Sequence, residues 1–104
     1  MGKLYIDSSN NLEIIIKLEI EGKTFIRKHV GQQRSSQMVL PLIDEILKEH
    51  GIKVQEITKI FVNPGPGSFT GLRVGVAIAN TLGFLLGISV NDKPVGQMVE
   101  PVYS

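Results

Sequence analysis

The sequence predicts an α/β domain with the element order βββαβαβ, built on a mixed five-stranded sheet and two main helices. Three observations support this fold class. Residues 12–20 alternate between apolar and polar side chains, which is typical of a half-buried strand. Residues 36–51 repeat apolar side chains at helical spacing. Residues 63–75 hold four glycines and two prolines between a short apolar run and a long uncharged apolar segment, which indicates a loop between a strand and a helix.

The first part of the chain is expected to form three antiparallel strands. An apolar run over 3–7 ends at Asp7, and the Ser-Ser-Asn-Asn composition of 8–11 indicates a turn. The second strand is expected to place its aliphatic residues on one face: Leu12, Ile14, Ile16, Leu18 and Ile20. A turn at Gly22 leads into a third strand over 24–30. Because these connections are short, the three strands are expected to form an antiparallel meander.

The rest of the chain is expected to alternate helices and strands. Ser35 or Ser36 is the predicted N-cap of the helix over 36–51, and Gly51 is predicted to end it. The remaining elements are expected in this order: a strand over 59–62, a helix over about 70–86 and a strand near 88–91. Helical crossovers return successive strands in parallel, so strand 59–62 is expected to run parallel to the first strand.

The composition is that of one globular domain and excludes several classes of function. Eleven Lys and Arg against ten Asp and Glu give no basic field, which argues against strong sequence-independent binding of nucleic acid by this chain alone. The absence of cysteine excludes disulfides, thiolate metal sites and thiol nucleophiles. The uncharged segment 74–91 includes Gly75, Asn80, Thr81 and Gly83, and a buried helix that runs into a strand explains it better than a membrane span does. Nothing in the first residues resembles a signal peptide, so the chain is expected to be cytoplasmic.

The Gly/Pro loop is a candidate binding site. If strand 59–62 lies beside the first strand and parallel to it, Asp7 and the loop emerge at the same sheet edge, where such sheets bind ligands. The free N–H groups at the start of the following helix favour an anion. The candidate nucleotide- or phosphate-binding residues are Asp7, Gly65, Gly67, Ser68, Thr70 and Gly71.

Four interpretations of this loop can be compared with the letters. A Walker loop would end in Gly-Lys-Ser/Thr, whereas residues 71–73 read Gly-Leu-Arg, so that interpretation fails. The three loop glycines, with Asp92 twenty-one residues after the last of them, fit a loose dinucleotide fingerprint. The phosphate loop of an actin-like fold fits the position of Asp7. A plain tight turn, with Asp7 capping the turn that follows it, explains the same residues. The last three interpretations remain open from the letters alone.

A row of small residues follows the loop. It recurs every four positions and comprises Gly71, Gly75, Ala79, Gly83 and Gly87. Each glycine inside a helix costs about 0.8–1 kcal/mol relative to alanine, so close approach of another backbone is expected in return. That backbone could belong to the chain's own sheet or first helix, or to a helix of another subunit. At Ala79 we expect another subunit.

No catalytic constellation is visible in the sequence. His29 and His50 are isolated from each other and from other metal-ligand types at ligand spacing, and Ser68 has no evident histidine partner. No catalytic residue and no metal site are therefore predicted.

Several segments together resemble one known family. The run PGPGSFTGLRVG at 64–75 closely resembles the signature of the TsaB (YeaZ) family, the accessory subunits for making threonylcarbamoyladenosine in tRNA. Three further segments are similar to the first strand and the two helices of that family: LYIDSS at 4–9, QMVLPLIDEIL at 37–47 and LRVGVAIANTLGFLLG at 72–87. The resemblance covers roughly residues 3–95. It implies that residues 1–104 form a single actin-like (ASKHA, ribonuclease H-like) lobe and that the second lobe of longer members is absent, while EPVYS at 100–104 is similar to the segment with which those members end.

The resemblance also implies a function. The chain would be a non-catalytic scaffold subunit that binds and supports a TsaD-type catalytic subunit in tRNA N6-threonylcarbamoyladenosine modification, with a TsaE-type ATPase in the assembly. It would contact tRNA only indirectly and have no cofactor, with ATP or ADP bound only within the complex. Apart from the resemblance, the chain alone is expected to form a homodimer, because the row at Gly75, Ala79 and Gly83 and the Leu/Ile-rich first helix offer a helical face to a partner. The residues expected at the partner interface lie on the two helices: Val39, Leu42, Ile43, Ile46, Leu72, Arg73, Gly75, Val76, Ala79 and Gly83. The alternatives are a small nucleotide-binding actin-like protein or a self-associating domain without catalysis.

Overall fold

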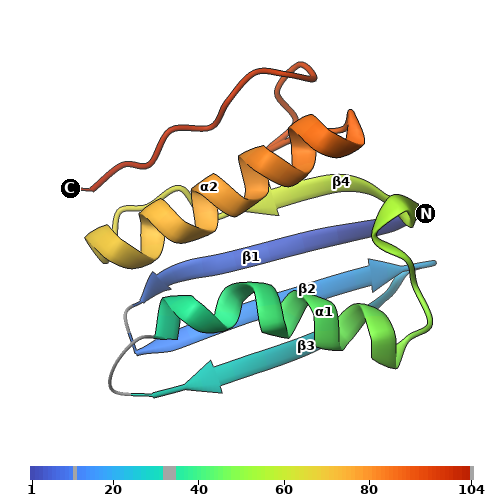
Figure 1. The fold of residues 1–104 in the computed structure, drawn as a ribbon, viewed down its shortest axis with the longest axis horizontal. Helices are drawn as coiled ribbons and strands as arrows, with labels where there is room; N and C mark the ends of the chain where they lie inside the picture. Colours follow the sequence, from blue (N-terminus) through green and yellow to red (C-terminus); the bar gives the residue numbers. More distant parts are fainter. Residues whose placement is uncertain (11, 32–34, 104) are drawn as a thin grey trace.

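A single sheet with helices on one side forms the molecule (Figure 1). The computed structural model describes residues 1–10, 12–31 and 35–103, so Asn11 of the predicted turn, the predicted cap at the Ser35 side chain and Ser104 of the tail lie outside the described residues. The strands are β1 (Gly2–Asn10), β2 (Glu13–Ile20), β3 (Lys23–Val30), β4 (Ile57–Val62) and β5 (Ser89–Val90). The main helices are α1 (Val39–Glu49) and α2 (Phe69–Leu86), and short 3₁₀ turns cover Ser35–Met38 and Val54–Glu56.

The sheet has the predicted mixed pairing. Its spatial order is β3-β2-β1-β4-β5. β1 and β3 pair with β2 in antiparallel fashion, whereas β4 pairs with β1 and β5 in parallel. The register places Ile6 beside Val62, so β1 and β4 end at the same edge of the sheet. The predicted order βββαβαβ and the predicted five-stranded mixed sheet are therefore confirmed.

Both helices cover the same face of the sheet (Figure 1). The alternating pattern of β2 places Ile14, Ile16 and Leu18 in the core with no exposed surface, whereas Leu12 is 48% exposed at the turn before the strand. The core is completed by Leu4 and Ile6 of β1 and by the inner faces of the helices. No helix among the described residues covers the opposite face, which carries the alternate side chains of the strands.

Besides Leu12, two local predictions differ from the structure. Residues 8–10 continue β1 rather than forming a turn, because Ser8 is buried beneath α2 and its hydroxyl donates to the Gly71 carbonyl at 2.6 Å. The N-cap of α1 is Met38, without a side-chain cap, since Ser36 lies within the preceding 3₁₀ turn. The predicted end of α1 at Gly51 is confirmed: Gly51 has a φ of +64°, and Ile52 N donates to the Leu47 carbonyl at 2.9 Å.

α2 is the one described helix that is long and apolar enough to cross a bilayer, by length and composition only. A helix that packs against the core of a globular domain passes the same test. One side of α2 is buried on β1, β4 and β5, which is the arrangement of such a packed helix.

Candidate functional site

The predicted site lies where β1 and β4 end. Asn63 N donates to the Ile6 carbonyl at 2.9 Å, and Ser68 N donates to the Ser9 carbonyl at 2.7 Å. The loop after β4 is therefore fastened to the end of β1 at both of its ends. The structure confirms that Asp7 and the Gly/Pro loop emerge at the same sheet edge.

Asp7 is held in a small polar network. Its Oδ1 accepts hydrogen bonds from Ser9 N at 3.0 Å, Ser9 Oγ at 2.6 Å and Asn63 Nδ2 at 3.4 Å. The Asn63 Oδ1 in turn accepts from Gly65 N at 3.0 Å. This carboxylate oxygen therefore organises the chain locally, as in the interpretation in which Asp7 caps the turn that follows it.

A depression of about 350 Å³ adjoins Asp7 on the uncovered face of the sheet. It is lined by Tyr5, Ile6, Asp7, Ile15, Lys17, Phe61, Val62, Asn63 and Asn91. The Tyr5 and Phe61 rings stack with their centroids 5.0 Å apart, and the Tyr5 hydroxyl donates to Glu19 Oε1 at 3.2 Å. Burial and then the hydrogen bond to Glu19 raise the pKa of Tyr5 above its usual value. The depression offers a carboxylate, a lysine and amide groups beside an aromatic pair.

The loop glycines are explained by contacts within the chain. A Cβ built on Gly67, Gly71 or Gly75 would overlap, respectively, the Ser9 carbonyl, the Ser8 carbonyl or the Ser8 hydroxyl. Because these glycines have no Cβ, the start of α2 packs directly on the end of β1. The close backbone approach that the glycines indicate is therefore approach to β1.

The polar loop residues have separate roles. Ser68 caps α2, because its Oγ accepts from Gly71 N at 3.4 Å. Thr70 is exposed and lies, with Arg73, Val74 and Ala77, around a shallow depression of about 340 Å³. The Arg73 guanidinium lies 5.2 Å from the centre of the Phe69 ring. Thr70 and Arg73 thus belong to the outer surface of α2 rather than to the network around Asp7.

Asp92, the acidic residue of the dinucleotide interpretation, is engaged elsewhere. Its carboxylate forms an ion pair with Lys59 Nζ at 3.0 Å on the uncovered face of the sheet. No group of three or more His, Asp or Glu residues that could hold a metal ion occurs within residues 1–10, 12–31 and 35–103.

The predicted partner-interface residues require a correction. Nine of the ten are buried in the chain's own fold: Val39, Leu42, Ile43, Ile46, Leu72, Gly75, Val76, Ala79 and Gly83. The small-residue row faces the sheet, since a Cβ on Gly75 would meet Ser8 and one on Gly83 would meet Val90. Arg73 alone among the predicted ten is exposed. The row therefore serves packing of α2 on its own sheet.

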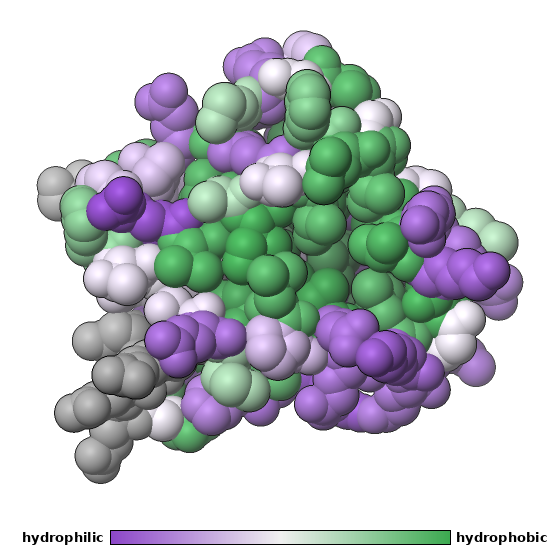
Figure 2. All heavy atoms as spheres, viewed as in Figure 1, coloured by the Kyte–Doolittle hydropathy of each residue, from purple (hydrophilic) through white to green (hydrophobic). Residues whose placement is uncertain are grey.

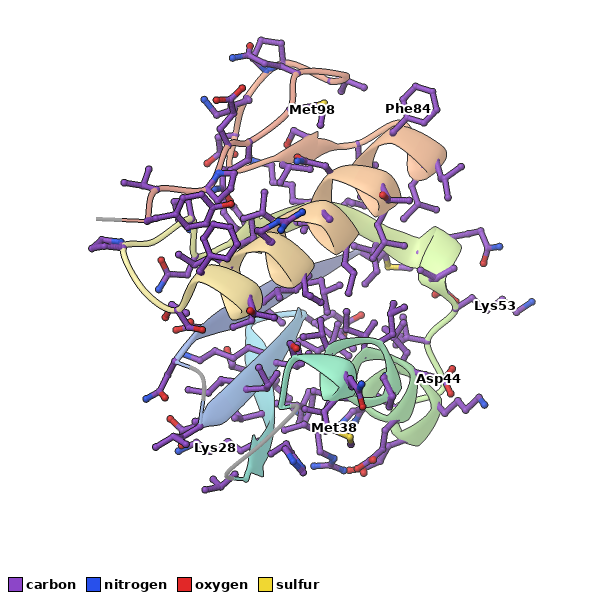
Figure 3. The ribbon with its side chains drawn as sticks, turned by 60° about the vertical axis from the view of Figure 1, so that its left-hand side comes forward. Lys28, Met38, Asp44, Lys53, Phe84 and Met98 are labelled. Atoms are coloured by element: carbon purple, nitrogen blue, oxygen red, sulfur yellow. The ribbon has the colours of Figure 1, made fainter. Side chains whose placement is uncertain are left out.

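The outer surface of α2 is nevertheless hydrophobic, whereas α1 exposes Asp44, Glu45, Lys48 and Glu49. Figure 2 shows hydrophobic surface over α2 and the space between it and α1. Val74, Ile78 and Leu82 form a half-buried row along α2, and Leu40 of α1 is 55% exposed. At the end of α2, Phe84 is 77% exposed and projects from the last turn near Met98 (Figure 3). These neighbours of the predicted residues are the ones available to a partner.

Three asparagines with structural roles were not predicted from the sequence: Asn63 and Asn91 at the sheet edge, and Asn80 in α2. The Asn91 side chain bonds to both backbone groups of Val62: its Oδ1 accepts from Val62 N at 2.8 Å, and its Nδ2 donates to the Val62 carbonyl at 3.0 Å. Asn80 does the same to Val99, with both distances at 2.9 Å. Asn63 and Asn91 each directly follow a strand, which is the sequence signal that could have identified two of the three.

Comparisons with known proteins find a TsaD-type family profile together with TsaB and YeaZ relatives. The profile of the family described as TsaD, tRNA N6-adenosine threonylcarbamoyltransferase, matches residues 20–92. The tRNA threonylcarbamoyladenosine biosynthesis protein TsaB of Haemophilus influenzae is 37% identical over 81 residues, which cover 78% of this chain and 34% of that protein. TsaB of Bacillus subtilis is 33% identical over 93 residues, which cover 88% of this chain and 40% of that protein. The solved structure of YeaZ from Pseudomonas aeruginosa superposes with a TM-score of 0.81 at 28% identity, covering 86% of this chain and 41% of that one. The chain thus matches a third to two fifths of the length of these relatives.

Proposed function

Because the chain belongs to the TsaB (YeaZ) family, we propose that it is a non-catalytic scaffold subunit that binds and supports a TsaD-type catalytic subunit in tRNA threonylcarbamoyladenosine synthesis. One observation carries the proposal beyond family membership. The half-buried aliphatic row of α2 is continuous with exposed apolar side chains beside it, on the side of the molecule that carries both helices. Exposed apolar surface of this kind supports a role in protein–protein contact.

The interface would use the outward-facing residues of α2 and the exposed Leu40 of α1. Val74, Ile78 and Leu82 supply the apolar centre, and Leu40 and Ala77 are exposed beside it. Helices with such surfaces pack by interdigitating side-chain rows, which favours a helical partner. In this proposal a TsaE-type ATPase also joins the complex, and tRNA is contacted only indirectly.

The site at the sheet edge supports a non-catalytic role for this chain. The Asp7 network and the loop glycines are used to fasten the loop and α2 to β1. Any ATP or ADP would accordingly bind within the complex rather than to this chain alone.

The test is direct binding to the TsaD-type subunit of the same organism, measured by calorimetry on purified proteins. Leu40→Glu and Ala77→Glu place a charge on the proposed surface at exposed positions, and each is expected to weaken binding by at least roughly tenfold, as for a residue that matters at an interface. Ile26→Glu is the matched control, because Ile26 is 47% exposed on the opposite face of the sheet and should leave binding unchanged. Equal binding by all three variants, or none by the wild type, would contradict the proposal.

One observation favours a second candidate, a small nucleotide-binding protein. The depression of about 350 Å³ beside Asp7 is of the size that small ligands occupy. Equilibrium binding of ATP and ADP to the isolated chain separates the two candidates. Binding that is abolished by Asp7→Ala would support the nucleotide-binding protein, whereas absence of binding is expected for a scaffold subunit.

A further inference from the structure

The end of the chain runs back along α2 toward the Gly/Pro loop (Figure 1). Asn80, in the middle of α2, fastens this tail: its Nδ2 donates to the Val99 carbonyl at 2.9 Å, and Val99 N donates to its Oδ1 at 2.9 Å. The Val99 side chain is only 3% exposed. One amide side chain therefore pairs with both backbone groups of a buried tail residue, as a neighbouring strand would.

The tail then contacts the loop itself. Val102 N donates to the Pro64 carbonyl at 2.6 Å. The Val102 carbonyl lies against the side of Gly65 where a Cβ would stand, and Gly65 has a φ of +115°, so only glycine fits this position easily. The Tyr103 ring packs on Phe69, the first residue of α2, with centroids 4.5 Å apart.

The loop is thus held from two sides. On one side Asn63 and Ser68 bond to the backbone of β1. On the other side Val102 and Tyr103 reach Pro64, Gly65 and Phe69 from the tail. Because glycine-rich backbone loses much conformational freedom when it is fixed in one shape, such a loop needs contacts of this kind.

We propose that residues 99–103 are a strap that holds the Gly/Pro loop in one shape, and that Asn80 is the positioning residue that fastens the strap. Because the loop leads directly into α2, the strap also fixes the first turns of the helix, where Arg73 and Val74 reach the outer surface. The consequence for partner binding rests on the proposed function, whereas the strap itself is a property of the chain alone.

Hydrogen exchange of the full chain, followed by mass spectrometry in the absence of any partner, tests the strap. Asn80→Ala removes both hydrogen bonds to Val99 and introduces the best helix former. Exchange in peptides that cover 64–70 and 97–103 should accelerate by roughly tenfold, given the net stabilisation of two hydrogen bonds, while peptides from β2 keep their rates. Thr81→Ala, at the adjacent exposed position, is the control and should change neither segment.

A second variant separates the contact between the strap and the loop from the contact between Asn80 and the strap. Val102→Pro deletes the N–H that bonds to Pro64 but leaves Asn80 and Val99 in place. The loop should then exchange faster while Val99 stays protected. Faster tail exchange with an unchanged loop in Asn80→Ala would overturn the proposal, as would an unchanged loop in Val102→Pro. If Asn80→Ala unfolds the chain, Val102→Pro decides alone. Neither outcome depends on whether a TsaD-type subunit binds.

Discussion

Tyr5 shows how a single residue on the uncovered sheet face responds to its neighbours. Its phenol is stacked on Phe61 and donates a hydrogen bond to Glu19. Deprotonation would remove that donor and place a negative charge beside a carboxylate, and partial burial disfavours the phenolate as well. Burial and the hydrogen bond to Glu19 therefore both raise the pKa of Tyr5.

The raised pKa gives a prediction at alkaline pH. A group whose pKa is higher in the folded than in the unfolded state stabilises the fold fully at pH values below its unfolded-state pKa. This stabilisation is lost as the pH rises through the folded-state pKa. The chain has two tyrosines, so Tyr103→Phe leaves Tyr5 as the only phenol. Its ultraviolet titration should have a midpoint above the ordinary value of 10.0. A Tyr5 midpoint at or below 10.0, in a protein still folded by circular dichroism, would contradict the assignment.

Gly75 carries a second prediction at the scale of one residue. Alanine favours a helix by about 0.8–1 kcal/mol over glycine, yet the added Cβ would overlap the Ser8 hydroxyl. We expect Gly75→Ala to lower the free energy of unfolding by about 1–3 kcal/mol, as overpacking does. In a Ser8→Ala background the penalty should shrink, because the overlapping oxygen is gone. Chemical denaturation of the two single variants and the double variant measures this coupling, and strict additivity would argue against the contact.

Among the helices and strands, the small-residue row of α2 differs from its prediction, in which Ala79 would face another subunit. Ala79 has no exposed surface and faces the sheet, so the row shapes the helix–sheet contact. Ala79→Leu should therefore destabilise the fold by about 1–3 kcal/mol, since there is no room for the larger side chain. Ala77→Leu, two positions along on the exposed side, should leave the melting temperature nearly unchanged. A thermal melt of both variants is the measurement. Equal melting temperatures would indicate that the small-residue row faces outward and not toward the sheet.

The elements themselves could be predicted because their signals are periodic. The alternation in β2 and the helical spacing in α1 each reflect burial of one face, and the structure buries those faces. The parallel pairing of β4 with β1 followed from the helical crossover between them. Element boundaries were less predictable: β1 extends to Asn10 because α2 covers Ser8, a contact between residues far apart in the sequence.

The site was predictable in position but not in purpose. Asp7 and the loop meet where the sequence places them, yet glycine spacing alone does not say what approaches the glycines. The groups that approach the loop glycines are Ser8, Ser9 and Val102. Val102 lies in the tail after β5, outside the predicted strands and helices. Which face of α2 packs on the sheet was equally hard to predict. A helix with small residues on one side and aliphatic residues on the adjacent side offers two contact surfaces.

At the scale of the whole molecule, both helices lie on one face of the sheet, so the chain has two distinct sides (Figure 1). The helix side presents the hydrophobic surface around Ile78 beside the charged residues of α1. The sheet side mixes charged pairs such as Lys59 and Asp92 with the Tyr5 and Phe61 rings. The buried centre of a protein–protein interface is usually depleted in charged residues and enriched in apolar ones. Self-association and partner binding are therefore both expected to use the helix side.

This arrangement predicts competition between two assemblies. If one surface serves both, the isolated chain should be a homodimer, and adding a TsaD-type subunit should convert it to a heterodimer rather than to a larger complex, because an isologous contact occupies the same patch on both copies. Analytical ultracentrifugation across a concentration series measures both states. Ala77→Glu should give a monomer, while Ile26→Glu, on the sheet side, should still dimerise. A dimer that survives Ala77→Glu, or one that binds the catalytic subunit without dissociating, would place self-association on another surface and separate it from the scaffold role.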